Sequence, residues 1–242
     1  RCIVPDHVGM GLSDRPDDGV SAQPRYDYTL QSRIDDLDAL LKHLRIDGPV
    51  TLAVHDWGGM IGFGWALRDP TRIRRLVITN TAAFPLPSAK RFPARLAMGR
   101  DSRLGGWLIR HFDLFARGAA WMGTKRSLPK HVRAAYAGVY DGWDNAISTL
   151  RFMQDIPLHD GDRAMPLVQA SAKALPGYAD RPAFIGWGLR DFVFDRHFLD
   201  GFRNALPNAE VHAYADAGHY ALEDKHEVLV PLIRAFLDRN PL

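Results

Sequence analysis

An apolar stretch that ends at a single carboxylate constrains the fold more than any other feature of this sequence. Residues 50–55 read Val-Thr-Leu-Ala-Val-His, a run that favours a β-strand, and Asp56 follows directly. A helix-length apolar segment, residues 58–67, then opens with two glycines and stops at an Asp-Pro pair. The pattern predicts a strand, a sharp turn and a helix. Gly58, two residues after the turn residue, is expected to let the two backbones pass closely.

The turn residue suggests a chemistry. A strand, a sharp turn and a helix make a nucleophile elbow, with Asp56 in the place that serine takes in the G-x-S-x-G form. An aspartate is ionised at neutral pH and can attack an sp³ carbon with a leaving group, or a carbon of a strained ring. A covalent ester would follow. The alternative is that Asp56 only caps the following helix, a common role for aspartate.

The segments around the elbow predict a mostly parallel, doubly wound α/β sheet, because strand and helix patterns alternate along the chain. Thr29 is a candidate N-cap for a helix that carries Leu30, Ile34 and Leu37 on one face. Further strands are expected at 76–80, 182–187 and 210–214, and further helices at 195–206 and after residue 219. Residues 1–6 read as the last part of a buried strand, so we expect amino-terminal strands to be missing.

The middle of the chain has a different pattern. From residue 84 to about 178, helical periods are broken by Pro and Gly, and no strand alternates cleanly. We therefore predict a core in two parts, 1–83 and 181–242, with a helical cap, 84–180, over the carboxyl ends of the strands. The bulky cap residues are expected to be mostly core, with two or three lining an apolar pocket. These residues are Trp107, Trp121, Trp143, Phe112, Phe115 and Met153.

Composition excludes several classes of protein. Of the 242 residues 24% are charged, and no apolar run reaches the roughly 18 residues of a membrane span, so no transmembrane segment is expected. The single cysteine, Cys2, fits a reducing cytoplasm. We find no metal-ligand spacing and no phosphate-binding loop, so neither a metal, a cofactor nor a nucleic-acid partner is predicted.

Charge is unevenly distributed. Residues 84–140 hold eleven Lys and Arg against two Asp, so with +9 in this segment and +3 in the whole chain the rest carries −6. A solvated face is the simpler interpretation of this basic segment. An anionic partner or a membrane surface is the alternative.

Three residues after three different strands form a catalytic constellation. Asp56, Asp191 and His219 occur in the order nucleophile, acid, histidine, each in a loop at the carboxyl end of a predicted strand, where open α/β sheets bind ligands. Asp191 would orient one ring nitrogen of His219, and the other would activate water. Asp195 competes for the acid role, but it falls where a helix should begin. The segment that closes strand 76–80, Asn80-Thr81-Ala82, offers no acid.

Trp57 follows the nucleophile directly. Its backbone N–H can donate to an oxyanion, and its indole N–H can hold an anionic leaving group. The alternative is a tryptophan packed in the core.

Three motifs resemble the haloalkane dehalogenase family of α/β hydrolases, and the resemblance runs from end to end. They are Val-His-Asp-Trp-Gly-Gly at 54–59, Gly-Trp-Gly-Leu-Arg-Asp at 186–191 and Ala-Gly-His at 217–219. The resemblance implies an α/β-hydrolase fold, with Asp56 as nucleophile, His219 as base, Asp191 as acid and Trp57 binding halide. Residues 26–32 and 79–85 resemble a branch with β-lactone decarboxylases of bacterial long-chain olefin biosynthesis. That branch implies decarboxylation of a cis-β-lactone to a cis-alkene, with an apolar substrate and other enzymes of an olefin assembly as partners.

The family also has an amino-terminal His-Gly-Asn-Pro loop, which supplies a second oxyanion donor and an Asn that shares the leaving group with Trp. This sequence lacks that loop, so we expect a fragment that folds poorly and is slow or inactive, since losing one oxyanion donor costs about 10²–10³ in rate.

Other activities stay open at this point. Haloalkane hydrolysis would use the same residues, with His219 activating water. Epoxide hydrolysis would need two cap tyrosines, for which Tyr136, Tyr140 and Tyr178 are candidates. A binding module without catalysis is the remaining reading, and the ordered constellation counts against it.

Overall fold

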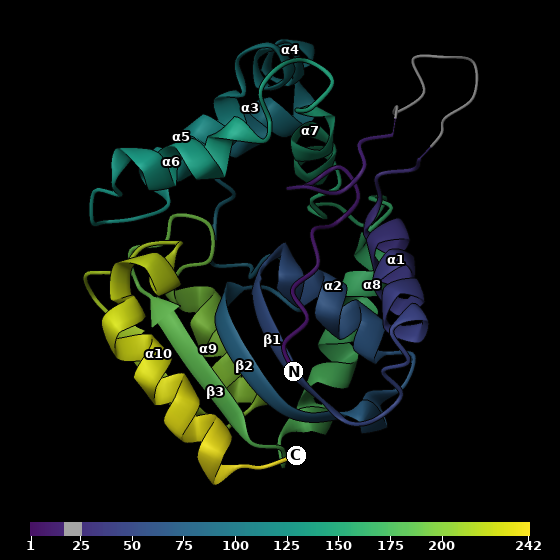
Figure 1. The fold of residues 1–242 in the computed structure, drawn as a ribbon, viewed down its shortest axis with the longest axis vertical. Helices are drawn as coiled ribbons and strands as arrows, with labels where there is room; N and C mark the ends of the chain where they lie inside the picture. Colours follow the sequence, from purple (N-terminus) through teal and green to yellow (C-terminus); the bar gives the residue numbers. More distant parts are fainter. Residues whose placement is uncertain (17–25) are drawn as a thin grey trace.

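A parallel four-stranded sheet forms the centre of the computed structural model, which describes residues 1–16 and 26–242. Its strands are β1 (Val50–Asp56), β2 (Ile73–Thr81), β3 (Ala183–Gly188) and β4 (Glu210–Tyr214), in that spatial order. All three pairings are parallel, so the carboxyl ends of the strands meet at one edge of the sheet. In Figure 1 this edge faces the cap helices at the top.

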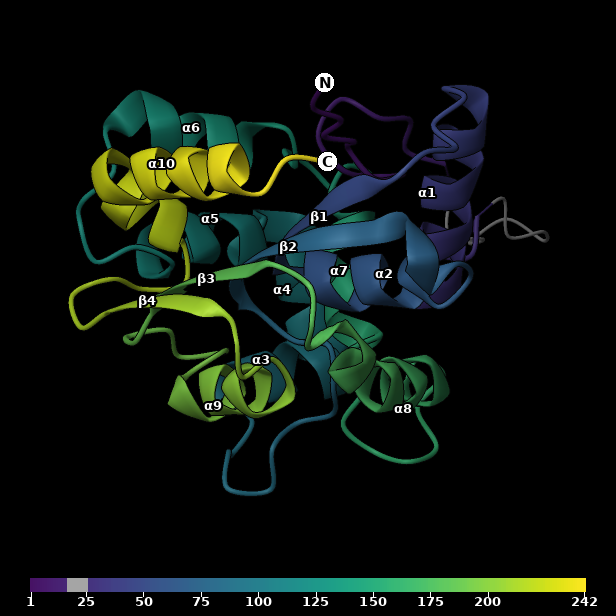
Figure 2. The same ribbon diagram turned by 90° about the horizontal axis from the view of Figure 1, so that it is seen from below.

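Helices cover both faces of the sheet (Figure 2). On one face lie α2 (Trp57–Ala66), α8 (Met165–Ala174) and α9 (Arg196–Ala205), which share the larger hydrophobic core with the sheet. On the other lies α10 (Ala221–Arg239), over a smaller cluster centred on Phe184 and Leu229. Helices on both faces explain why β3, and residues 76–78 in the middle of β2, read as apolar runs rather than as alternating ones.

The helix before β1 begins as predicted. α1 (Leu30–His43) has Thr29 as its N-cap, and the Thr29 hydroxyl accepts from the backbone N–H of Ser32. Leu30 and Ile34 are buried in the larger core, where α1 packs against α2. Two short 3₁₀ helices, Pro70–Arg72 and Leu175–Tyr178, each lead toward a strand.

Five cap helices lie over the carboxyl edge of the sheet (Figure 1). They are α3 (Ala94–Asp101), α4 (Arg103–Phe112), α5 (Leu114–Met122), α6 (Lys130–Gly138) and α7 (Ile147–Gln154). α8 instead packs against α2. The division at residues 84 and 180 stays a prediction.

Two expectations about these regions are wrong. Residues 1–6 form no strand, because no described strand lies beside them to complete a ladder, and Val4 is 91% exposed. Four of the six bulky cap residues are exposed rather than core: Trp107 (45%), Phe112 (52%), Trp121 (67%) and Trp143 (43%). Only Met153 is buried, and Phe115 is half-buried.

Among the residues that the structure describes, no helix is both long and apolar enough to cross a membrane.

Candidate active site

The elbow between β1 and α2 holds Asp56 in a conformation that few side chains adopt. Its φ is 48° and its ψ is −123°, so the chain reverses sharply at the end of the strand. The close approach occurs at Gly59, where a Cβ would collide with Thr81 Oγ1 and with the Ala82 carbonyl oxygen. At Gly58 a Cβ would meet nothing closer than 3.9 Å, so the prediction assigned this role to the wrong glycine.

Asp56 does not cap the helix that follows it. Its side chain makes no N-capping hydrogen bond to α2, so the capping alternative is wrong. Its backbone carbonyl instead accepts from the Thr81 hydroxyl, and Thr81 Oγ1 accepts from the Gly59 N–H at 3.0 Å. The elbow is thereby joined to the end of β2, and the carboxylate stays available.

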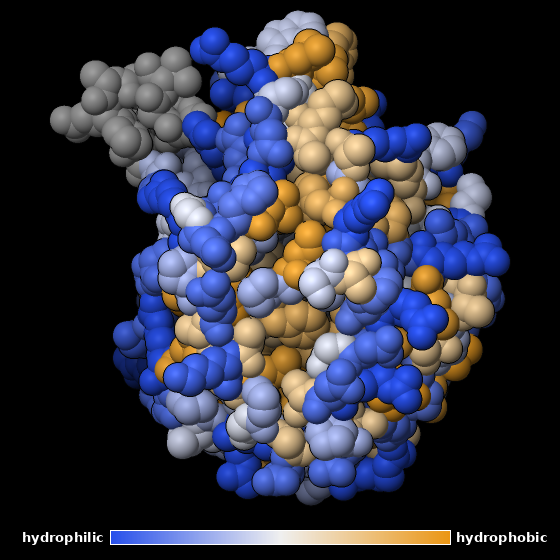
Figure 3. Space-filling view, turned by 180° about the vertical axis from the view of Figure 1, so that it is seen from behind, coloured by the Kyte–Doolittle hydropathy of each residue, from blue (hydrophilic) through white to orange (hydrophobic). Residues whose placement is uncertain are grey.

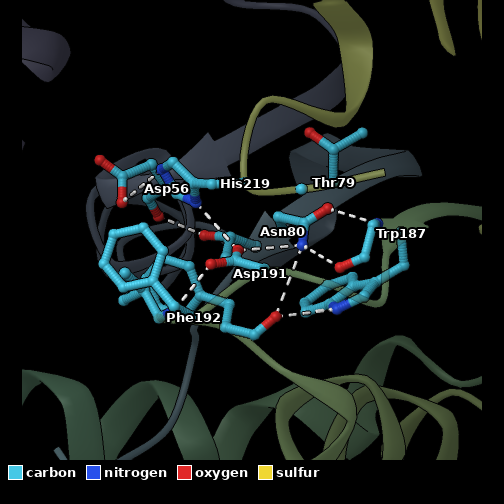
Figure 4. Close-up of polar contacts among 12 residues, drawn as sticks. Asp56, Thr79, Asn80, Trp187, Asp191, Phe192 and His219 are labelled. Atoms are coloured by element: carbon cyan, nitrogen blue, oxygen red, sulfur yellow. Dashed lines mark hydrogen bonds and ion pairs between the residues drawn. The ribbon is translucent and has the colours of Figure 1, made fainter. Parts of the chain in front are cut away.

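The three predicted catalytic side chains meet at the carboxyl edge of the sheet (Figure 4). His219 Nδ1 lies 2.9 Å from Asp191 Oδ2, and His219 Nε2 lies 3.6 Å from Asp56 Oδ1. The imidazole therefore stands between the two carboxylates, with one nitrogen directed at each. This is the arrangement of a nucleophile, a histidine and its orienting acid.

The competing acid is excluded by its contacts. Asp195 caps α9 by accepting from the backbone N–H of His197 at 3.0 Å, and it pairs with Lys90 at 2.9 Å. Asp191 is fully buried behind His219 and holds the orienting position.

Asn80 is the residue of this site that the sequence reasoning missed. Its Nδ2 donates to Asp191 Oδ2 and to the Gly188 carbonyl, both at 3.0 Å, while its Oδ1 accepts from the Gly188 N–H at 2.8 Å. Asn80 thus fixes the acid against β3 from the end of β2 (Figure 4). An amide side chain at the end of an apolar strand was the available signal. The sequence argument asked only whether that position held an acid.

The pKa values of the two carboxyl groups are shifted in opposite directions. Burial raises the pKa of Asp56, while the charge of His219 and a hydrogen bond from the Trp57 backbone oppose that rise. Burial also tends to raise the pKa of Asp191, but other interactions outweigh it. The charge and hydrogen bond of His219, with the N–H groups of Val193 and Phe194, hold its pKa below the ordinary value.

The pKa values of His219 and His55 are also shifted in opposite directions. Burial tends to lower the pKa of His219, but Asp191 and Asp56 outweigh it and the pKa is raised. Burial, with the adjacent charge of His219, lowers the pKa of His55 to about 3. The His55 ring, 4.8 Å from that of His219, therefore stays neutral and packs against it.

A cavity of about 490 Å³ lies between this catalytic floor and the cap. Asp56, Trp57 and His219 line its core end. Apolar residues of the cap line the other end, among them Leu96, Ile109, Phe115 and Met153. Trp57 is half-buried and meets Phe152 edge to face at 5.0 Å, so it is a wall of the cavity and not a fully buried core residue.

The three tyrosines proposed for epoxide chemistry do not line this cavity. Tyr136 donates to Glu223 Oε1 at 2.7 Å and stacks on Tyr220, and Tyr178 is buried against Phe63 in the core. Tyr140 is half-buried, and burial raises its pKa. Epoxide hydrolysis would need two cap tyrosines in the cavity, and none of these three tyrosines supplies one. In the described part of the chain no cluster of His, Cys, Asp or Glu could hold a metal ion.

An aspartate at a strand-to-helix elbow, a second aspartate after a strand and a loop histidine between them, on a parallel sheet, have the arrangement of an α/β-hydrolase site. A family model described as the alpha/beta hydrolase fold matches residues 1–226, and the chain belongs to this family. It is an enzyme with a helical cap.

Curated relatives carry two kinds of name. A cis-3-alkyl-4-alkyloxetan-2-one decarboxylase of Xanthomonas campestris pv. campestris is 69% identical over all of this chain and 81% of that protein. One of the same name from Shewanella oneidensis is 52% identical over 98% of this chain and 73% of that protein. A haloalkane dehalogenase of Mycolicibacterium paratuberculosis is 30% identical over 93% of this chain and 70% of that protein.

Solved structures agree on the fold. The haloalkane dehalogenase DbeA from Bradyrhizobium elkani superposes with a TM-score of 0.80 at 23% identity, over 97% of this chain and 81% of that one. The predicted α/β-hydrolase fold and the predicted resemblance to haloalkane dehalogenases and β-lactone decarboxylases are confirmed.

Proposed function

We propose that this enzyme decarboxylates a cis-3,4-dialkyl β-lactone, an oxetan-2-one, to a cis-alkene and carbon dioxide. The observation that carries the proposal is a carboxylate nucleophile on the floor of an apolar cavity, in a chain 69% identical to a protein named for this reaction. The cavity volume of about 490 Å³ lies within the roughly 300–1,000 Å³ of small-molecule sites.

In the first step Asp56 attacks C4, the ring carbon bonded to the ring oxygen. The C4–O bond breaks, its electron pair goes to the oxygen, and a carboxylate forms on C3 while C4 becomes an ester of Asp56. The Trp57 indole N–H, beside Asp56 in the cavity wall, is the donor for this new carboxylate.

In the second step the bond from C3 to the carboxylate breaks and releases carbon dioxide. Its electron pair forms the C3=C4 double bond, and the C4–O bond to Asp56 breaks, which returns the free carboxylate. His219 Nε2, 3.6 Å from Asp56 Oδ1, stabilises that returning charge when the imidazole is protonated. No water is consumed.

The stereochemistry supports this order of events. Attack from the side opposite the ring oxygen inverts C4 and leaves the ester and the new carboxylate antiperiplanar. Elimination from that geometry needs no rotation about C3–C4, and it leaves the two alkyl groups on the same side. A cis-lactone therefore gives a cis-alkene.

Haloalkane hydrolysis is the second candidate, because a water molecule activated by His219 would hydrolyse the same ester at Asp56. Product analysis after incubation with a long-chain cis-β-lactone separates the two. The decarboxylase yields an alkene by gas chromatography and mass spectrometry. A β-hydroxy acid, or untouched lactone together with halide release from a bromoalkane, would instead assign a hydrolase.

Heavy-oxygen water gives a second, independent readout. Hydrolysis of the ester introduces the heavy isotope into the Asp56 carboxylate, whereas decarboxylation leaves Asp56 unlabelled. A labelled active-site peptide after lactone turnover would contradict the proposal. The Asp56→Asn variant is the control, since it forms no ester by either route.

We extend the proposal to the surroundings of the enzyme. A cytoplasmic location is supported by the single cysteine of the chain. Its functional partners are expected to be the enzymes that close the β-lactone ring, because their product is this substrate.

A further inference from the structure

Large apolar side chains are exposed on the outer surface of the cap, on adjacent helices. Leu104, Trp107 and Phe112 lie on α4 and Trp121 lies on α5, and together we call these four residues the cap patch. The Arg133 guanidinium of α6 lies over the Trp121 ring, 4.2 Å from its centroid. Trp107 stacks on His111 and meets Phe112 edge to face. Exposed apolar residues gathered in this way mark an interaction site more often than scattered ones do.

The patch adjoins the wall of the cavity. Met98 on α3, with Leu114 and Met122 on α5, are exposed to solvent and also line the cavity. α4 packs against both α3 and α5, so these residues and the cap patch belong to one group of helices. In Figure 3 apolar atoms gather over the cap at the top and continue toward the hollowed middle of that face. An apolar surface thus leads from the cap toward the catalytic floor.

Positive charge accompanies the patch. The segment 84–140 has eleven Lys and Arg and two Asp. Both aspartates are already paired, Asp101 with Arg100, and Asp113 with Arg117 at 3.6 Å. Arg117 also lies 3.9 Å from Asp141, and Arg103 is exposed beside the patch. Residues 141–180 add three Lys and Arg and six Asp, so the whole segment 84–180 carries +9 − 3 = +6. The cap therefore presents tryptophans and phenylalanine in a positively charged segment, the composition that favours the interface of an anionic bilayer.

We propose that the cap patch docks on the surface of an anionic lipid bilayer, so that a dialkyl lactone enters the cavity from the bilayer and the alkene returns to it. This inference rests on the proposed function, because an uncharged lactone with two alkyl chains, and its alkene, partition into lipid. The charge of the cap selects an anionic bilayer rather than a neutral one.

Vesicle co-sedimentation of the full chain tests the docking. Binding to phosphatidylcholine vesicles with about 30% phosphatidylglycerol should exceed binding to pure phosphatidylcholine by about tenfold or more, and 1 M salt, where the Debye length is about 3 Å, should abolish that difference. Equal binding to both vesicles, or none to either, would overturn the proposal.

Variants locate the contact. Trp107→Ala with Phe112→Ala and Trp121→Ala should lower vesicle binding about tenfold or more, because each buried aromatic contributes to interfacial affinity. Val228→Ala with Val230→Ala, at two exposed apolar residues of α10, is the apolar control and should bind as wild type does. Arg103→Ser with Arg117→Ser should reduce only the anionic preference. The matched charge control is Arg196→Ser with Arg203→Ser on α9.

Turnover separates this inference from the proposed function. The patch variant should convert a short-chain, water-soluble cis-β-lactone at the wild-type rate, since none of its three substituted residues lines the cavity. It should convert a long-chain lactone carried in anionic vesicles about tenfold more slowly. If the patch variant and the wild type convert the vesicle-bound lactone at equal rates, docking is overturned, whereas the proposed lactone turnover is not. If the wild-type protein is a dimer and the patch variant is a monomer, the patch is instead an interface with a second copy of the chain.

Discussion

The two ends of the cavity are built in opposite ways. At the core end, Asp191 receives hydrogen bonds from His219, from Asn80 and from the Val193 N–H, and every donor stands on or directly after a strand or in its loop. At the cap end, Ile109, Leu150 and Met153 form a small apolar cluster of their own. Directional bonds fix the reacting groups, whereas apolar contacts fix only volume, so chemistry and substrate size should respond to different substitutions.

The largest effect should come from the nucleophile. Asp56→Asn removes the charge that attacks C4 while keeping the size of the side chain, and it should lower kcat by roughly 10³-fold or more. Lactone binding should persist, because the cap end of the cavity is unchanged. Steady-state kinetics together with equilibrium binding of the lactone check both parts. A variant that retained a tenth of wild-type kcat would exclude Asp56 as the nucleophile.

Substitution of the orienting acid, Asp191, should have the second largest effect on kcat. Asp195 offers a matched control in the same part of the chain. Asp191→Asn removes the charge that fixes His219, and should lower kcat by roughly 10²-fold or more. Asp195→Asn changes a helix cap four residues away and should leave kcat within about twofold, with little loss of stability, because Asn caps helices about as well as Asp. Kinetics and thermal melts of the pair check this. Equal losses of kcat would contradict the assignment of the acid.

The comparison also explains what the sequence could predict. Asp56, Asp191 and His219 could be singled out because each lies at the end of a strand or in the loop after it, and parallel pairing brings strand ends to one edge whatever the rest of the chain does. Asn80 was missed because its role depends on a hydrogen bond across strands, which no local pattern encodes.

The cap was predicted only in outline. Helical periods in residues 84–178 indicated helices, but the face that each helix buries depends on its neighbours. Trp107 and Trp121 were therefore expected in the core by their size, and the packing of α4 and α5 leaves them exposed. The glycine error at the elbow has the same origin, since contact of Gly59 with the end of β2 is tertiary.

The acid limb of the pH profile tests the electrostatics of the core end. Asp56 attacks as a carboxylate, so kcat/KM should fall as pH falls through its pKa, by about tenfold per pH unit. Because burial raises that pKa, the limb should lie above the ordinary 3.8 of an aspartate. The profile is measured with a short-chain soluble lactone. A limb at or below 3.8 would contradict the stated environment of Asp56.

Substitution of Asn80, which holds Asp191 in place, should have a moderate effect on kcat. Asn80→Ala removes the amide donor to Asp191 and leaves the Gly188 N–H without its acceptor, while the Gly188 carbonyl keeps the Asp191 N–H at 3.3 Å. Each unsatisfied buried group costs about 1–3 kcal/mol, so the melting temperature should fall, and kcat should drop by roughly tenfold as His219 loses its fixed orientation. A lower melting temperature with unchanged kcat would make Asn80 structural only.

The smallest effect should come from the cap end, and it should appear in KM rather than in kcat. Phe115→Ala removes a half-buried ring that lines the cavity, so a long-chain lactone loses apolar contact worth about 1–2 kcal/mol, and KM should rise by roughly 5- to 30-fold. Trp143→Ala, at an exposed cap aromatic that does not line this cavity, should leave KM unchanged. A short-chain lactone that does not reach Phe115 should show no difference between the two variants. If Phe115→Ala lowered kcat as strongly as it raised KM, the division between a core that performs the chemistry and a cap that only selects size would fail.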